Sequence, residues 1–177
     1  MHVNIESERW ADRDAIKTVV RAAFDHQQSV ADLVDLIRES LEFVPELSLV
    51  ARHEGEVVGH VMFSHAQLVD ERSITHRVLT LSPLAVAPPW QGRGIGSALV
   101  SAGLAAADVF GEQLVTVEGS PGYYSRFGFR DCRTLGVQIN LPSWAPLDAG
   151  MVYILPAYDQ AVRGRLVYPP AFAAVHD

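Results

Sequence analysis

The sequence contains a single cysteine, Cys132, among its 177 residues. One thiol cannot form a disulfide within the chain, and this fits a reducing compartment. We therefore expect a cytoplasmic protein. No catalytic partner for Cys132 is evident in the sequence, so we expect its thiol to be inert.

Basic residues are also scarce, because 14 Lys and Arg stand against 21 Asp and Glu and give a formal net charge of −7. Duplex nucleic acid demands a basic surface, so this balance argues against a nucleic-acid partner. No apolar run approaches the roughly 20 residues of a membrane span, and no apolar secretory segment follows Met1. We expect neither a nucleic-acid nor a membrane partner.

The rest of the composition, 49% hydrophobic and 20% charged, is that of a globular domain with a sizeable core. An apolar helix lies between two strand-like runs, and this order predicts a parallel crossover. We expect one α/β domain. Its expected strands lie at 2–7, 47–52, 56–69, 76–87, 113–119, 137–141 and 151–155, and its expected helices at 10–24, 31–41 (ended by Pro45) and 95–110, with Gly55 in a hairpin.

The stretch WQGRGIGSAL, residues 90–99, places Gly92, Gly94 and Gly96 just before the apolar helix. Each glycine in a helical turn costs about 1 kcal/mol relative to alanine. The first N–H groups of a helix lack partners and carry partial positive charge, and bare backbone lets phosphate oxygens approach them. Arg93 adds a cation beside them. The stretch indicates an anion-binding loop, and a simple turn before a buried helix is the alternative.

Two common phosphate-binding motifs fit this stretch poorly. A P-loop ends in Gly-Lys-Ser/Thr, and the stretch has no lysine. A dinucleotide-binding fingerprint needs glycine at position 97, which is Ser97, and it usually lies in the first strand–helix unit.

The segment Gln91-Gly92-Arg93-Gly94-Ile95-Gly96 resembles the Arg/Gln-x-x-Gly-x-Gly/Ala signature of the GNAT superfamily of N-acetyltransferases. Downstream, YYSRFGF at 123–129 is similar to the Tyr-x-x-x-Gly-Phe segment of that family, and the resemblance covers about residues 1–140. It implies a GNAT fold, in which a mixed, mostly antiparallel sheet is flanked by helices and a splayed parallel strand pair holds acetyl-CoA. The domain would span residues 1–177, with roughly the last 35 residues as a Pro-containing extension.

The resemblance also implies how acetyl-CoA binds, without any metal. The backbone of Leu84, Ala85 and Val86 would hold the pantetheine arm. Pro83 cannot donate a ladder hydrogen bond, and it fits the bulge that the family has in this strand. The pyrophosphate would lie on the loop and the first helical turn, which comprise Gln91, Gly92, Arg93, Gly94, Ile95, Gly96 and Ser97.

The implied reaction is attack of a primary amine on the thioester through a tetrahedral intermediate, whose oxyanion a backbone N–H of the bulged strand would stabilise. Tyr124 lies four residues before Gly128, matches the general acid of the family, and would protonate the departing thiolate. Aromatic packing is the alternative for Tyr124. The strand before Leu84 offers no carboxylate, so Glu118 is the nearest candidate base. An ordinary exposed Glu118, with a water chain to backbone carbonyls as the base, is the alternative.

Two function classes follow from these residues. The first is an acetyl-CoA-dependent N-acetyltransferase acting on a small molecule or a protein. The second is an acyl-CoA-binding sensor or interaction module without turnover. Tyr124 favours the enzyme, and the missing strand carboxylate leaves the second class open.

Two further expectations concern metal binding and assembly. The odd spacing of His60 and His65 puts them on opposite faces of a regular strand, so we do not expect them to share a metal. The 95–110 helix is apolar nearly all round, so its outer face needs cover from the C-terminal segment or a second subunit. We favour a homodimer.

Overall fold

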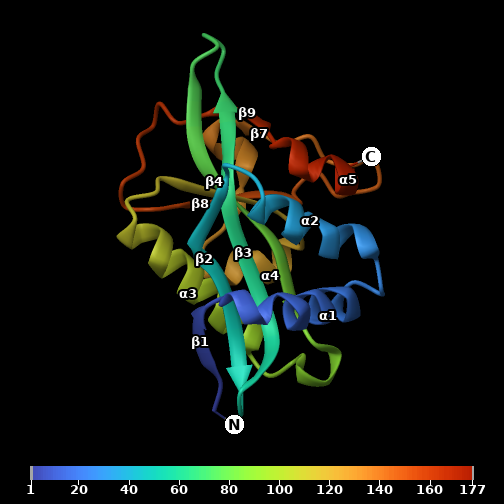
Figure 1. Ribbon diagram of the computed structural model, residues 1–177. Helices are drawn as coiled ribbons and strands as arrows, with labels where there is room; N and C mark the ends of the chain where they lie inside the picture. Colours follow the sequence, from blue (N-terminus) through green and yellow to red (C-terminus); the bar gives the residue numbers. More distant parts are fainter. Residues whose placement is uncertain (1, 177) are drawn as a thin grey trace.

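A mixed sheet runs through the computed structural model, which describes residues 2–176, and helices lie on both of its faces (Figure 1). Within these residues nine strands follow the order β1-β2-β3-β4-β5-β8-β6, with β9 paired to β3 and β7. The β4–β5 and β7–β9 pairs are parallel and the others antiparallel. The strands are β1 (Asn4–Ser7), β2 (Phe43–His53), β3 (Glu56–Val69), β4 (Thr75–Val86), β5 (Leu114–Glu118), β6 (Arg130–Asp131), β7 (Val137–Gln138), β8 (Gly150–Ile154) and β9 (Gly164–Val167).

Helices α1 (Arg13–Ala23) and α2 (Gln28–Arg38) cover one face of the sheet, and α3 (Ile95–Val109) covers the other. Each helix buries residues three or four apart against the sheet; α1 and α2 are amphipathic, whereas α3 is apolar nearly all round. No helix within residues 2–176 is long and apolar enough to cross a membrane. The short elements are α4 (Pro121–Tyr124), α5 (Ala173–His176) and 3₁₀ turns at Trp10–Asp12, Pro88–Trp90, Ser125–Phe127, Cys132–Leu135 and Pro170–Phe172.

Helix α3 packs closely on the sheet, because Gly103 leaves room for the ring of the fully buried Phe63. Its outer face is exposed at Ala98, Ser101 and Ala105. The C-terminal segment packs with α2 on the other face of the sheet, so it does not provide the cover expected for α3. The homodimer stays a prediction.

The sequence places most elements within a few residues of their observed ends, and the exceptions have local causes. Helix α2 begins at Gln28 rather than residue 31, and Pro45 lies inside β2 rather than ending the helix. Pairing with β3 shifts register between Phe43 and Ser48, and an irregular stretch of strand tolerates a proline. Strands β6 and β9 are two and four residues long, too short to show a periodic pattern.

Strands β4 and β5 diverge soon after they meet. They pair only at Leu79–Val115 and Thr80–Thr116, although β4 continues to Val86 and β5 to Glu118. Beyond Thr80, no strand in the described part of the chain pairs with the edge of β4 that faces β5. The sheet therefore contains the splayed parallel pair that the sequence predicts.

A bulge in β4 accompanies this divergence. Val61 pairs with Leu84 and Phe63 with Leu81, so the one residue between them on β3 faces both Ser82 and Pro83. The Ser82–Pro83 peptide bond is cis. The proline thus lies where the ladder is interrupted, as expected from its missing N–H.

Candidate active site

The glycine-rich loop leads from β4 into α3 through left-handed backbone. Gly92 has φ +72° and Gly94, which precedes the first helical residue, has φ +80°, a region that L side chains rarely adopt. No atom lies within 4 Å of the place where a Cβ would stand at either glycine. The loop therefore leaves open space at the start of α3, where the first N–H groups have no partner within the helix.

Side chains next to these glycines fix the loop to its surroundings. The Gln91 amide donates a 2.9 Å hydrogen bond from Nε2 to the carbonyl of Val86, which ties the loop to the end of β4. The Arg93 guanidinium lies 5.2 Å from the centre of the Trp90 ring. Gln91 therefore shapes the loop, and Arg93 places a cation beside it.

Gly96, in the first turn of α3, makes room for a side chain from the second motif. A Cβ at this position would lie 2.6 Å from the hydroxyl oxygen of Tyr123. The third glycine is thus explained by the close packing of Tyr123.

Arg126 also lies at the start of α3, and the sequence reasoning missed it. Its guanidinium stacks 4.5 Å from the centre of the Tyr123 ring, donates from Nε to the Tyr123 carbonyl (3.1 Å), and reaches Ser97 Oγ at 3.5 Å. The only sequence signal was its place inside the YYSRFGF segment. The structure adds a second exposed cation to the helix N-terminus.

Tyr124 ends α4, and its ring packs against Gly119, the residue that follows β5. The side chain is buried among the residues that contact α3, with the rings of Tyr123 and Phe129 at 5.0 and 5.5 Å. Burial, with a smaller contribution from Tyr123, raises the pKa of Tyr124 above its usual value. The phenol therefore keeps its proton at neutral pH.

Glu118 ends β5 and is half-buried, so it is not an ordinary exposed carboxylate. Its neighbour Val117 belongs to the core beneath α3, and alternation along the strand turns Glu118 to the opposite face. Glu118 Oε1 accepts a 2.7 Å hydrogen bond from the hydroxyl of Tyr168. Burial and the charge of Glu118 raise the pKa of Tyr168.

The two candidate catalytic side chains both belong to segments at the end of β5, and they lie on opposite faces of the sheet. Tyr124 lies on the α3 face and Glu118 on the face of α1 and α2. Residues Leu84–Val86 of β4 pair only with β3, so their other edge is open. That edge offers backbone groups to an extended ligand.

The two histidines of β3 have separate partners. His60 is fully buried, with Nδ1 3.0 Å from the Leu49 carbonyl, and burial lowers its pKa to about 4. His65 Nε2 lies 2.7 Å from a carboxylate oxygen of Glu112. Cys132 is buried, and burial raises the pKa of its thiol. Over residues 2–176, no group of three or more His, Cys, Asp or Glu side chains is arranged to hold a metal ion.

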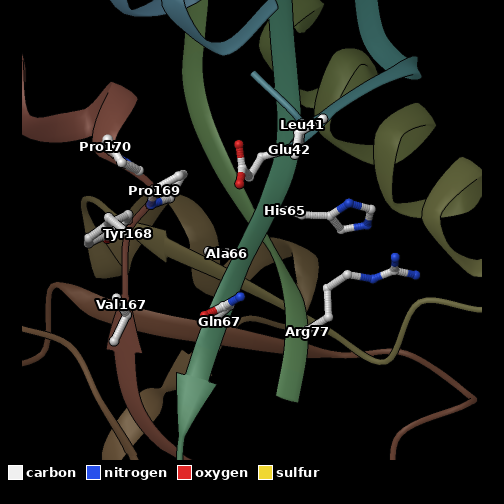
Figure 2. A pocket seen from close by; sticks show the side chains of 10 residues that line it. All are labelled: Leu41, Glu42, His65, Ala66, Gln67, Arg77, Val167, Tyr168, Pro169 and Pro170. Atoms are coloured by element: carbon white, nitrogen blue, oxygen red, sulfur yellow. The ribbon is translucent and has the colours of Figure 1, made fainter. Parts of the chain in front are cut away.

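A cavity of about 340 Å³ lies away from the glycine loop, between β3 and the segment after β9 (Figure 2). Residues 65–67 and 168–170 line it together with Glu42 and Arg77. None of the residues predicted to hold acetyl-CoA or to catalyse transfer lines it.

The chain is similar to known acetyltransferases in sequence and in fold. A model of the acetyltransferase (GNAT) family matches residues 10–129. YjhQ of Escherichia coli strain K12, an uncharacterized N-acetyltransferase, is 38% identical over 122 residues, which are 69% of this chain and 66% of that protein.

Solved structures of two GNAT family proteins resemble this chain over 97% of its length. The GNAT family N-acetyltransferase YhbS from Escherichia coli, in complex with CoA, has a TM-score of 0.85 at 29% identity, over 97% of this chain and 92% of that one. A GNAT family acetyltransferase from Brucella melitensis, in complex with acetyl-CoA, has a TM-score of 0.77 at 28% identity, over 97% and 98%.

Proposed function

Because the chain belongs to the GNAT family of acetyltransferases, we propose that it transfers the acetyl group of acetyl-CoA to a primary amine of a small molecule or a protein. One observation carries the proposal: β4 and β5 part after two residue pairs, and the free part of β4 leads into a loop of left-handed glycines at a helix N-terminus. Two relatives with this fold bind CoA or acetyl-CoA.

The residues at the split fit the chemistry of acetyl-CoA, which supplies the thioester when bound. The unpaired edge of Leu84–Val86 offers backbone groups to the amides of a pantetheine arm. Gly92 to Ser97 offer bare backbone to a pyrophosphate, and Arg93 and Arg126 offer positive charge beside it. Binding then needs no metal ion.

Tyr124 and Glu118 divide the proton transfers between them in this proposal. Glu118 takes a proton from the acceptor amine as its nitrogen bonds to the acetyl carbon. When the carbon–sulfur bond breaks, Tyr124 gives its phenolic proton to the sulfur and later regains one from solvent. The phenol of Tyr124 is protonated at neutral pH, as this role requires, and burial raises its pKa, which also makes it a weaker acid.

A panel of amine acceptors, with release of free CoA thiol as the readout, tests the function. We expect acetyl-CoA to bind in calorimetry with a chelator present, and at least one class of amine to release CoA. Binding without release for every amine would favour an acyl-CoA sensor. Loss of binding in chelator would contradict the metal-free site.

A further inference from the structure

Ser82 lies on β4 just beyond the point where the two parallel strands part. It follows Thr80, the last residue of β4 that pairs with β5, by two positions. Its side chain is half-buried, and its hydroxyl forms no hydrogen bond with any residue between 2 and 176. The hydroxyl is therefore available to a ligand in the split.

The bulge in β4 directs Ser82 to the face of the sheet that α1 and α2 cover. Leu81 belongs to the core beneath α3, so alternation along the strand turns Ser82 to the opposite face. Met62, the residue of β3 that faces the bulge, packs in the core beneath α1 and α2, in agreement with this direction. Ser82 and Glu118 thus lie on the same face, each two residues beyond the last pair of β4 and β5.

The direction of the proposed acetyl-CoA site brings its reactive end towards Ser82. The glycine-rich loop follows β4, so a pantetheine arm along Leu84–Val86 runs from the loop back towards the last strand pair. Its thioester would then lie near the start of the split. Thr80 is only 1% exposed, so Ser82 is the first residue of β4 beyond the pair whose hydroxyl an incoming amine can reach on this face.

We propose that Ser82 contacts the attacking amine, and that its Oγ accepts a hydrogen bond from one N–H of the amino group of the acceptor. A hydroxyl oxygen can accept such a bond from an ammonium group or from a neutral amine. Holding one N–H on Ser82 orients the nitrogen, so that its lone pair faces the acetyl carbon once the amine is neutral. This inference rests on the proposed function, and it holds whichever group acts as the base.

Ser82→Ala removes the hydroxyl and keeps the strand position. We expect kcat/KM for the acceptor to fall by roughly 3- to 10-fold, the effect of losing one hydrogen bond, with the KM for acetyl-CoA unchanged. The loss should be similar for acceptors with different bodies, because they share only the amino group. A loss confined to one acceptor would place the contact on its body and overturn the inference.

Ser64→Ala is the matched control. Ser64 pairs with Thr80 on the same face of the sheet, is fully buried, and its Oγ has no hydrogen-bond partner within residues 2–176. The control removes an equivalent hydroxyl that no substrate can reach, so it should keep the wild-type kinetic constants.

Calorimetry separates contact with the amine from contact with the thioester. When the enzyme is saturated with CoA, which lacks the acetyl group, Ser82→Ala should raise the Kd of the acceptor while the Kd of CoA stays unchanged. A wild-type Kd for the acceptor with a lowered kcat would assign the hydroxyl to the thioester. That result, or wild-type constants throughout, would overturn the inference and leave acetyl transfer standing. If the wild type acetylates no amine, the proposed function and the inference are both wrong.

Discussion

The two ends of the candidate site, the loop before α3 and the end of β5, differ in whether backbone or side chains form them. At the loop before α3, backbone predominates, because left-handed glycines leave open space and Arg93 and Arg126 add charge beside it. At the end of β5, side chains dominate, since Tyr124 is buried and the half-buried Glu118 and Tyr168 are joined by a hydrogen bond. In the proposed function the first end binds a phosphate and the second transfers protons.

We therefore expect substitutions at the loop and substitutions at the end of β5 to change different kinetic constants. Changes in the loop should affect the KM for acetyl-CoA, because the loop binds the same groups in substrate and transition state. Changes at the end of β5 should affect kcat, because proton transfer occurs only during the reaction.

The largest effect is expected for Tyr124→Phe at the catalytic end. The change removes one hydroxyl and little packing, and acid catalysis typically contributes about 10²–10⁴-fold, so kcat should fall by that factor. The KM for acetyl-CoA should change far less. Steady-state release of CoA thiol with a good acceptor measures both, and a wild-type kcat in the variant would show that another group protonates the thiolate.

The pH profile of the wild type sharpens this assignment. The rate should rise with pH as the acceptor amine loses its proton, and it should fall only where Tyr124 ionises. Burial raises the pKa of Tyr124, so the fall should come at higher pH than about 10, the value of an ordinary phenol. A fall well below pH 10 that persists in Tyr124→Phe would exclude Tyr124 as its cause.

The next effect is expected for Gly94→Val at the binding end. A branched side chain at φ +80° strains the backbone and fills the open space, so the KM for acetyl-CoA should rise by about 10-fold or more with little change in kcat. Gly111→Val is the control, since it has φ +71°, no atom within 4 Å, and lies at the other end of α3. Equal KM values for acetyl-CoA in the two variants would show that the phosphate does not bind at this loop.

The smallest effect is expected for Arg126→Ala. Losing one exposed cation beside a phosphate should raise the KM for acetyl-CoA by about 3- to 10-fold, and added salt should reduce the difference from wild type. Arg72→Ala, an exposed arginine in the turn between β3 and β4, serves as the control. An unchanged KM for acetyl-CoA in Arg126→Ala would show that Arg126 does not contribute to binding, which would leave that role to the backbone and Arg93.

The sequence predicts the binding end better than the catalytic end, and the reason is physical. Left-handed turns need glycine, so a loop formed by backbone is visible in the sequence as closely spaced glycines. The elements on either side are also predicted well, since the strand at 76–87 and the helix at 95–110 match β4 and α3 within a residue. Tyr168 leaves no such mark. Its place depends on pairing between β9 and β3, whose partner residues Leu166 and Leu68 are far apart in the chain.

Close packing of Gly96 against Tyr123 connects the glycine-rich loop with the YYSRFGF segment. The hydroxyl of Tyr123 occupies the space that a side chain at position 96 would need, 2.6 Å from the ideal Cβ. An alanine at 96 would therefore require the end of the Tyr123 side chain to shift, or a residue at 123 that lacks this hydroxyl. We expect a side chain at 96 to be accompanied by a change at 123, although 26 residues separate the two positions in the sequence.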